Sequence, residues 1–300
     1  MGISWPSDLS DSSKTVSYDY TQGKSLDNSA PVYTNIQKKS NGNYLITYAY
    51  IYAYNDCGPK INIKAEASAV VTLKVSTDIS VCPAGVHNGD IEHAQVLLTS
   101  GLSFISVTFA YHEWDKTFTS SEIGWDGTHP VAYMGKGSHA LYGSSGDNHY
   151  LYMWDIDKTA SYTCIKYCKV LGIKIPCGTK SCTYGFTSSG SLYDTTGSTY
   201  KFKGVVRVLA SNVFTVSSSS LSSDEQKLLE FQGRFGEQVT NSGWSTIENS
   251  INTSLAALYI ICSSCKSTVQ SGLSVGESHF ESEAPKSLAT KSWWTNTDVI

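Results

Sequence analysis

Alternation of apolar and polar residues with a period of two dominates the first two thirds of the chain. Residues 44–54 read YLITYAYIYAY, which places Tyr and Ile at every second position and Leu, Thr, Ala and Ile between them. Such a run predicts a strand that is buried on at least one face. By the same pattern, further strands are expected at 61–75, 91–99, 103–111, 130–135, 149–155 and 202–210.

Turn signals separate these runs, and a helical period is almost absent before residue 220. The predicted fold class is therefore mainly β, an antiparallel β-sandwich with C-terminal helices packed against it. Ser223 can cap a first helix, with Gln226 returning the bond. A second helix is expected because apolar residues recur at spacings of three and four from Trp244 to Cys262. We expect it to pack on the sandwich, and insertion into a membrane is the alternative.

The pattern also divides the chain. Residues 1–29 lack periodicity and predict an N-terminal arm that contributes little to the core. Residues 30–220 form the predicted β-sandwich core, with a Cys-rich insertion near 158–190. Residues 221–300 form a helical C-terminal extension of the same domain.

Composition narrows the function classes. The chain has 300 residues, 40% of them hydrophobic and 16% charged, so it can bury a large core. Its formal charge of -4 and its scattered basic residues argue against a nucleic-acid partner. Apolar runs are shorter than the roughly 20 residues of a membrane-spanning helix, which leaves peripheral membrane contact as the expected kind. No charged leader followed by an apolar core is visible. The Ser, Thr and Tyr-rich surroundings of the cysteines still favour a secreted protein, whose leader is then expected to have been removed or replaced by a starting Met.

Eight cysteines fall into three groups along the chain. The groups are Cys57 and Cys82, then Cys164, Cys168, Cys177 and Cys182, and then Cys262 and Cys265. Disulfides are the preferred interpretation, because the spacing within the second group fits zinc motifs poorly. Free thiols or a metal site are the alternatives. Asn252 begins an Asn-Thr-Ser acceptor pattern for glycosylation, which is compatible with secretion.

Side chains that can bind a metal ion are concentrated in the run His87-Asn88-Gly89-Asp90-Ile91-Glu92-His93. A strand starting near Asp90 places Asp90 and Glu92 on one face, roughly 7 Å apart. A turn at Asn88 and Gly89 is expected to fold His87 back over this pair. Carboxylates with one imidazole suit Mg²⁺, Mn²⁺ or Ca²⁺ better than zinc, so the run predicts a divalent-cation site. The alternative is that the acids are ordinary strand residues and His87 is a turn residue.

Several motifs in order resemble the vacuolar protein sorting-associated protein 62 (Vps62) family. They are APVYTN at 30–35, YAYIYAYND at 48–56, HNGDIEH at 87–93, FAYHEW at 109–114, HPVAYMGKGSHALY at 129–142, YDTTGSTY at 193–200 and FQGRFGE at 231–237. The chain departs from that family at Ile91, where its members usually carry Trp. The segment 158–190 looks like an insertion.

The same central motif is more distantly similar to the necrosis- and ethylene-inducing cytolysin-like proteins. Those proteins are β-sandwiches that hold a divalent cation with an Asp from a preceding strand end and the His, Asp and Glu of the motif. The resemblance implies that the ligands here are Asp56, His87, Asp90 and Glu92. About thirty residues separate Asp56 from His87, more than that family allows.

Four further residues are candidates for ligand binding around the cation. His139 follows Ser138 between small residues, where it can reach the same cavity as a hydrogen-bond donor, and a buried structural histidine is the alternative. His112 and Trp114 end a predicted strand and can line the mouth of the site. Trp114 can also stack on a sugar ring, with burial in the core as its alternative.

Motifs for nucleophilic catalysis, phosphate loops and dinucleotide binding are missing from the sequence. We therefore expect a non-enzymatic, secreted protein that binds a glycolipid head group or a glycan through a divalent cation. In the most specific version of this expectation, the protein has a cytolysin-like action. A metal-dependent hydrolase is one alternative. A self-assembling structural surface protein is the other.

Overall fold

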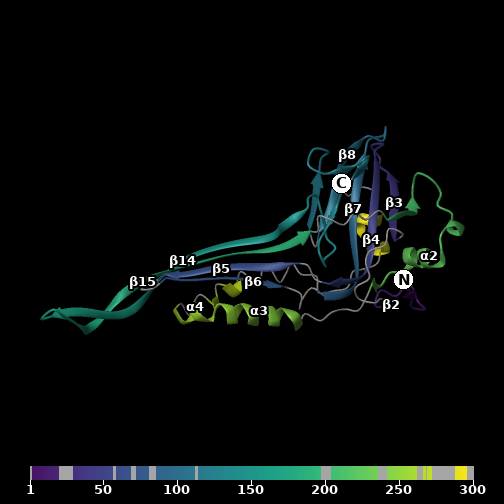
Figure 1. Cartoon of the computed structure of the whole chain (residues 1–300). Coiled ribbons are helices and arrows are strands. Elements are labelled where there is room, and N and C mark those ends of the chain that lie inside the picture. Colours follow the sequence, from purple (N-terminus) through teal and green to yellow (C-terminus); the bar gives the residue numbers. More distant parts are fainter. Residues whose placement is uncertain are drawn as a thin grey trace.

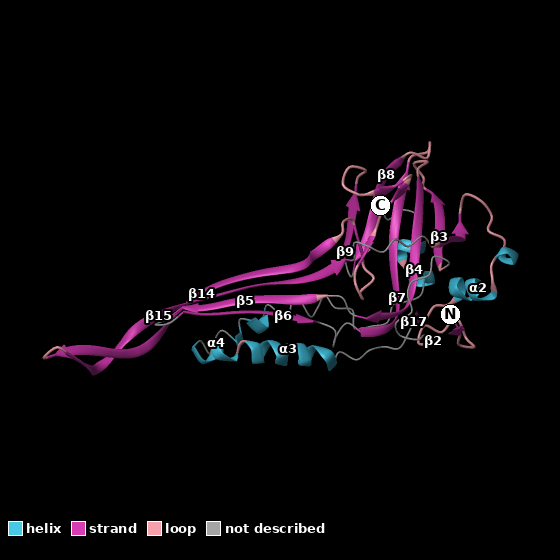
Figure 2. Cartoon of the chain, viewed as in Figure 1, coloured by secondary structure: helices cyan, strands magenta, loops and turns pink. Residues whose placement is uncertain are grey.

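The fold is described from a computed structural model of the chain. The structure describes residues 2–19, 30–56, 59–68, 72–80, 86–111, 114–196, 204–235, 242–261, 266–267, 269–271 and 288–295. Figures 1 and 2 show an upright body, here called the head, and an elongated body, here called the arm. The head is built on a six-stranded sheet and the arm on a four-stranded sheet, so the protein is mainly β, as predicted.

The head sheet has the strand order β16-β3-β4-β7-β8-β9. The strands are β3 Pro31–Lys38, β4 Tyr44–Asp56, β7 Val86–Leu98, β8 Phe104–Tyr111, β9 Trp114–Phe118 and β16 Val205–Ser211. Neighbours are antiparallel except β16 and β3, which are parallel. Residues that pair directly point to one face, so the pairs Tyr50 with Glu92 and Tyr52 with Asp90 share a face. We call it the tyrosine face.

Each face of the head sheet has its own core. Over the tyrosine face lies the segment 119–142, and the core there is Ala94, Val96, Val107, Phe109, Phe118 and Leu141. The opposite face is covered by N-terminal residues, by helix α2 (Ser223–Glu230) and by C-terminal residues. Its core is Val16, Ala49, Ile91, Leu209, Leu228, Phe231, Phe235, Leu288 and Trp294. Val16, which comes from the N-terminal segment 1–29, is fully buried in this core.

Short elements complete the head. The strands β1 Gly2–Ser4, β2 Thr15–Asp19 and β17 Arg234–Phe235 make a three-stranded sheet. Two small hairpins join β10 Trp125–Asp126 to β11 His129–Pro130 and β12 Tyr133–Met134 to β13 Leu141–Tyr142. The remaining helical turns are Ser218–Ser220, Leu288–Thr290 and α6 Ser292–Thr295.

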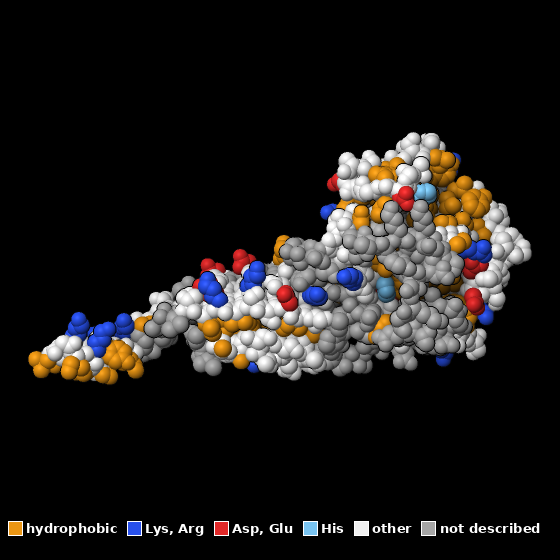
Figure 3. Space-filling view, viewed as in Figure 1, with side chains coloured by type: hydrophobic (Ala, Val, Ile, Leu, Met, Phe, Trp, Pro, Cys, Tyr) orange, Lys and Arg blue, Asp and Glu red, His pale blue; other side chains and the backbone are white. Residues whose placement is uncertain are grey.

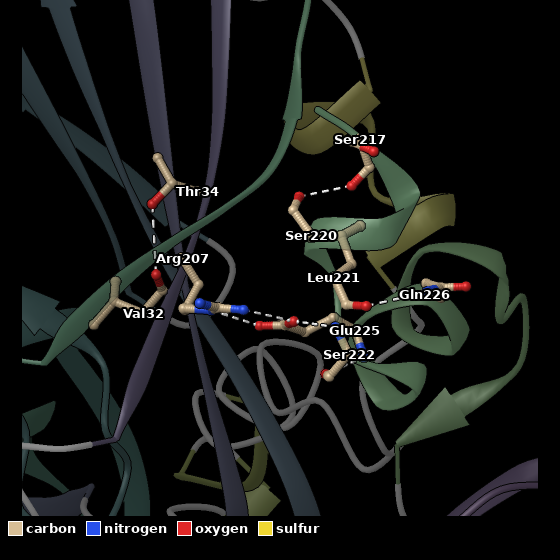
Figure 4. Close-up of polar contacts among 9 residues, drawn as sticks. All are labelled: Val32, Thr34, Arg207, Ser217, Ser220, Leu221, Ser222, Glu225 and Gln226. Atoms are coloured by element: carbon tan, nitrogen blue, oxygen red, sulfur yellow. Dashed lines mark hydrogen bonds and ion pairs between the residues drawn. The ribbon is translucent and has the colours of Figure 1, made fainter. Parts of the chain in front are cut away.

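Helix α2, Ser223–Glu230, is fixed to the head sheet through Glu225. The Ser222 hydroxyl accepts the Glu225 main-chain N–H at 3.2 Å, and the Glu225 carboxylate accepts the Ser222 N–H at 2.7 Å (Figure 4). The same carboxylate accepts Arg207 Nε and Nη2 at 2.8 and 2.9 Å. These Arg207 hydrogen bonds hold the pKa of Glu225 down at about 2, against the opposing effect of burial. The helix cap therefore lies one residue before the predicted Ser223.

The arm sheet has the order β14-β15-β5-β6. Its strands are β5 Lys60–Ser68, β6 Thr72–Ser80, β14 Gly146–Val170 and β15 Ile173–Thr196. Helices α3 Ser242–Ser254 and α4 Ala256–Ile261 lie along it (Figure 2). Their shared core is Ile61, Ile63, Ala65, Ala67, Phe186, Ile247, Ile251, Leu255, Leu258 and Val269. The helical spacing predicted after Trp244 thus packs on this sheet.

A long hairpin projects from the arm. Strand β15 pairs with β5 only over Gly185–Tyr193, whereas its pairing with β14 continues to Val170 and Ile173. Residues 160–184 therefore extend past the end of β5, and we call them the projecting hairpin (Figure 1).

One finer fold prediction is wrong, and a second is not confirmed. The expected strand at 61–75 is wrong, because β5 and β6 are two antiparallel strands joined between Ser68 and Thr72. The two-layer sandwich is not confirmed and stays a prediction. Among the described residues, the head sheet and the arm sheet bury their side chains in different cores, and α3 packs on the arm sheet.

Candidate functional site

Asp90 lies at the centre of a polar cluster on the tyrosine face. Its side chain and that of Glu92 are both buried in β7. The Nδ1 atom of His139 lies 3.0 Å from Asp90 Oδ2, and the Asn55 amide donates to the same oxygen at 3.4 Å. The loop 135–140 brings His139 to this position, where its backbone has a φ of 60°. We call Asp90, Glu92, His139, Asn55 and Tyr52 the head cluster.

Tyr52 forms the aromatic wall of the head cluster. Its ring stacks on the His139 imidazole with 4.0 Å between centroids and 7° between planes. Burial raises the pKa of Tyr52 well above its usual value, with further contributions from Tyr50 and from the charges of Glu92 and Asp90. The phenol therefore stays protonated, and its hydroxyl donates to Met134 Sδ at 3.3 Å. The cluster joins two acids, an imidazole and a neutral phenol.

The predicted residues are brought together only in part. Asp90 and His139 come within 3.0 Å of each other, Glu92 is buried on the same face of β7, and Ser138 is buried beside His139. His87 and Asp56 lie in the same end of the β7–β4 ladder, but their side chains fall outside the described part of the chain. The side chain of Trp114 and all of His112 also fall outside it.

The predicted turn at Asn88 and Gly89 is wrong. Strand β7 continues through both residues, and His87 pairs with Asn55 in the ladder. Gly89 instead allows a backbone with a φ of 73° within the strand, where its missing Cβ leaves room for the main chain of Phe235. The glycine serves the packing of β17 on β7, so part of the H-N-G-D-I-E-H motif has a structural role.

The donor set of the head cluster fits a hard cation, since carboxylate oxygens dominate it. Within the described ranges, however, no group of three or more His, Cys, Asp and Glu residues has the geometry to hold a metal ion. The Asp90 carboxylate instead accepts a hydrogen bond from the Asn55 amide and pairs with the His139 imidazole. The divalent-cation site stays a prediction.

His93 lies on the opposite face of β7, under the C-terminal segment. Its ring stacks on Trp293 with 4.0 Å between centroids, while its buried Nε2 has no hydrogen-bond partner within the described part of the chain. Burial, followed by the positive charge of Lys291, lowers the pKa of His93 to about 3. The side chains of Asn35 and Gln95 donate to the carbonyls of Trp294 and Trp293 nearby.

We expect this histidine to make the fold sensitive to acid. The folded state keeps His93 neutral, whereas the unfolded state protonates it below a pKa of 6.5, so stability falls as pH drops from 6.5 toward 3. At pH 5 the loss is about 2 kcal/mol. His93→Phe keeps the stacking and removes the titration, so its urea midpoint should fall less between pH 7 and pH 5. If the urea midpoints of the wild type and of His93→Phe fall equally between pH 7 and pH 5, this prediction is contradicted.

The tip of the projecting hairpin is a second candidate site, which the sequence analysis missed. Leu171 is 98% exposed, Ile173 67%, Val170 50% and Ile175 42%. Leu171 and Gly172 form a two-residue loop in which both φ values are positive, 52° and 82°, as in a type I′ turn. A bulky apolar residue at positive φ is rare, and here its side chain is fully presented to solvent. These four residues are called the apolar tip.

A disulfide joins Cys168 to Cys177 just behind the apolar tip. This pair confirms the preferred interpretation of the second cysteine group, and Cys182 is disulfide-bonded as well. The sequence signal for the hairpin was the alternation IKYCKV before Leu171 and Gly172 and IKIPC after them. Against the pattern of the resembling family, the same stretch is expected only as a Cys-rich insertion near 158–190.

Comparison of the chain with protein-family models, with curated proteins and with solved structures finds no match. The resemblances described above therefore stay predictions. Among the described residues, no helix is both long and apolar enough to cross a membrane.

Proposed function

We propose that this protein is a non-enzymatic, secreted protein that binds membranes peripherally, and that the apolar tip makes the contact. The single observation that carries the proposal is the gathering of Val170, Leu171, Ile173 and Ile175 at the end of the projecting hairpin (Figure 3). Scattered exposed apolar residues are ordinary, but a cluster on a projecting element is typical of an interaction site.

The shape of the arm supports a membrane surface as the partner. The projecting hairpin holds the apolar tip away from the head, so a flat surface can reach it without a clash (Figure 1). The disulfide between Cys168 and Cys177 ties the two strands together at this point. Insertion of a preformed tip loses little conformational entropy, which favours binding.

Sedimentation with lipid vesicles tests the proposal. We expect the purified chain to sediment with phospholipid vesicles in the presence of a chelator, because the apolar tip needs no cation. Failure to sediment with neutral and with anionic vesicles would overturn the proposed function.

A second candidate function rests on the head cluster. In this form the head is a β-sandwich that holds Mg²⁺, Ca²⁺ or Mn²⁺, and the cation presents an open position to a sugar hydroxyl or phosphate oxygen of a glycolipid or glycan. The observation in its favour is the burial of Asp90 and Glu92 on one face, beside His139 and Tyr52. A bound cation would offset the charge of these two buried acids.

Metal-dependent stability tests this second candidate. We expect millimolar Ca²⁺, Mg²⁺ or Mn²⁺ to raise the Tm by about 2 °C or more, since a ligand of the native state stabilises it. Asp90→Asn should abolish the rise. Glu230→Gln, which changes an exposed acid on α2, should keep it. A wild-type Tm that no divalent cation changes would exclude the site.

A further inference from the structure

We infer that four lysines on the projecting hairpin bind the anionic head groups of a lipid bilayer, an inference that rests on the proposed function and names its lipid class. Lys166, Lys169, Lys174 and Lys180 are all exposed. No Asp or Glu stands between Asp157 and Asp194, although the whole chain carries a net charge of -4. The projecting hairpin is thus a basic segment of an acidic protein.

The position of two of these lysines destabilises the free hairpin. Lys169 and Lys174 are direct cross-strand partners one position behind the pair Val170 and Ile173. Like charges in this arrangement repel each other and destabilise a strand pair. An anion between the two ammonium groups would turn the repulsion into attraction, so the pair suits a negatively charged ligand better than it suits the free hairpin.

The central pair Lys169 and Lys174 and the apolar tip occupy different sides of the hairpin. Successive residues of a strand point to opposite faces, so Val170 and Ile173 face away from Lys169 and Lys174. Figure 3 shows the basic side chains along one side of the tip and the apolar side chains along the other. This amphipathic arrangement fits a hairpin that lies obliquely in the interface, with its apolar side in the lipid and its lysines reaching the head groups.

A bilayer explains both sides at once. An apolar protein partner would leave the lysines without a counterion, and a nucleic acid would leave the apolar tip in water. Anionic lipids supply both an apolar interior and a dense negative surface that attracts nearby lysines.

Vesicles of phosphatidylcholine alone, and of phosphatidylcholine mixed with phosphatidylserine, test the inference. The wild-type chain should bind the mixed vesicles more tightly, and added salt should reduce the difference. The double variant Lys169→Gln/Lys174→Gln should bind mixed vesicles about 30-fold more weakly and neutral vesicles unchanged. Since it removes a repulsive pair, it should keep the fold, which circular dichroism can check.

The control variant is Lys60→Gln/Lys64→Gln, which changes net charge equally at two exposed positions of β5. It should bind both vesicles as the wild type does. Equal binding to both vesicles, or equal losses in the two double variants, would overturn the inference while leaving the proposed function intact. If the wild-type chain binds neither kind of vesicle, both the inference and the proposed function are overturned.

Discussion

Leu171→Asn should weaken vesicle binding by about 10- to 100-fold, the loss expected when one leucine no longer enters an apolar phase. The change should not harm the hairpin. Asn accepts a positive φ more readily than Leu does, and Asn-Gly is the preferred pair for a type I′ turn. Vesicle sedimentation measures the binding, and thermal unfolding should show equal or slightly higher stability.

The chain offers a matched control for this substitution. Leu102 is also an exposed leucine at positive φ, with a φ of 64° and an exposure of 64%, but it lies in the turn between β7 and β8 of the head. Leu102→Asn should leave vesicle binding unchanged. If the two variants lose binding equally, the apolar tip has no special part in the contact.

Gly89→Ala should destabilise the protein by about 3 kcal/mol or more. An added Cβ would overlap the main-chain carbonyl of Phe235, and the φ of 73° is unfavourable for any residue with a side chain. Either β17 or β7 would have to move, and Asp90 follows directly in the chain. The urea midpoint measures the loss.

Gly127→Ala is the control, since Gly127 has a φ of 64° in an exposed turn where no atom of the described residues lies within 4 Å of the added Cβ. It carries the backbone strain without the overlap, so it should lose only about 1 kcal/mol. A similar loss in both variants would mean that β7 does not depend on the close approach of Phe235.

The sequence predicted the central strands of the head well because their burial makes the alternation regular. The run around Tyr50 and Tyr52 and the run after Asp90 are strands β4 and β7. Placing Asp90 and Glu92 on one face followed from the same period. The approach of His139 could be suggested but not fixed, because the loop that carries it is positioned by long-range packing.

The projecting hairpin was missed for a physical reason. Between residues 160 and 184, lysines, cysteines, Ser and Thr stand among the Ile, Val and Tyr residues, so no sustained apolar period of two appears. Strand β15 thus lacks the regular alternation that identifies β4. Its apolar residues gather instead at Leu171, where solvent and not a core surrounds them. That mismatch between residue type and environment becomes visible only in three dimensions.

The most direct measurement is the fluorescence of a tryptophan placed at the tip, in Leu171→Trp, with vesicles whose lipids carry bromine on the acyl chains. The seven native tryptophans also fluoresce, so the signal of the added tryptophan is the difference between the fluorescence of the variant and that of the wild type. Membrane contact through the apolar tip predicts that the added fluorescence shifts to the blue and is quenched by the brominated lipids, whereas that of Leu102→Trp is not. Vesicle-bound protein whose tryptophan at position 171 stays unquenched would contradict the account.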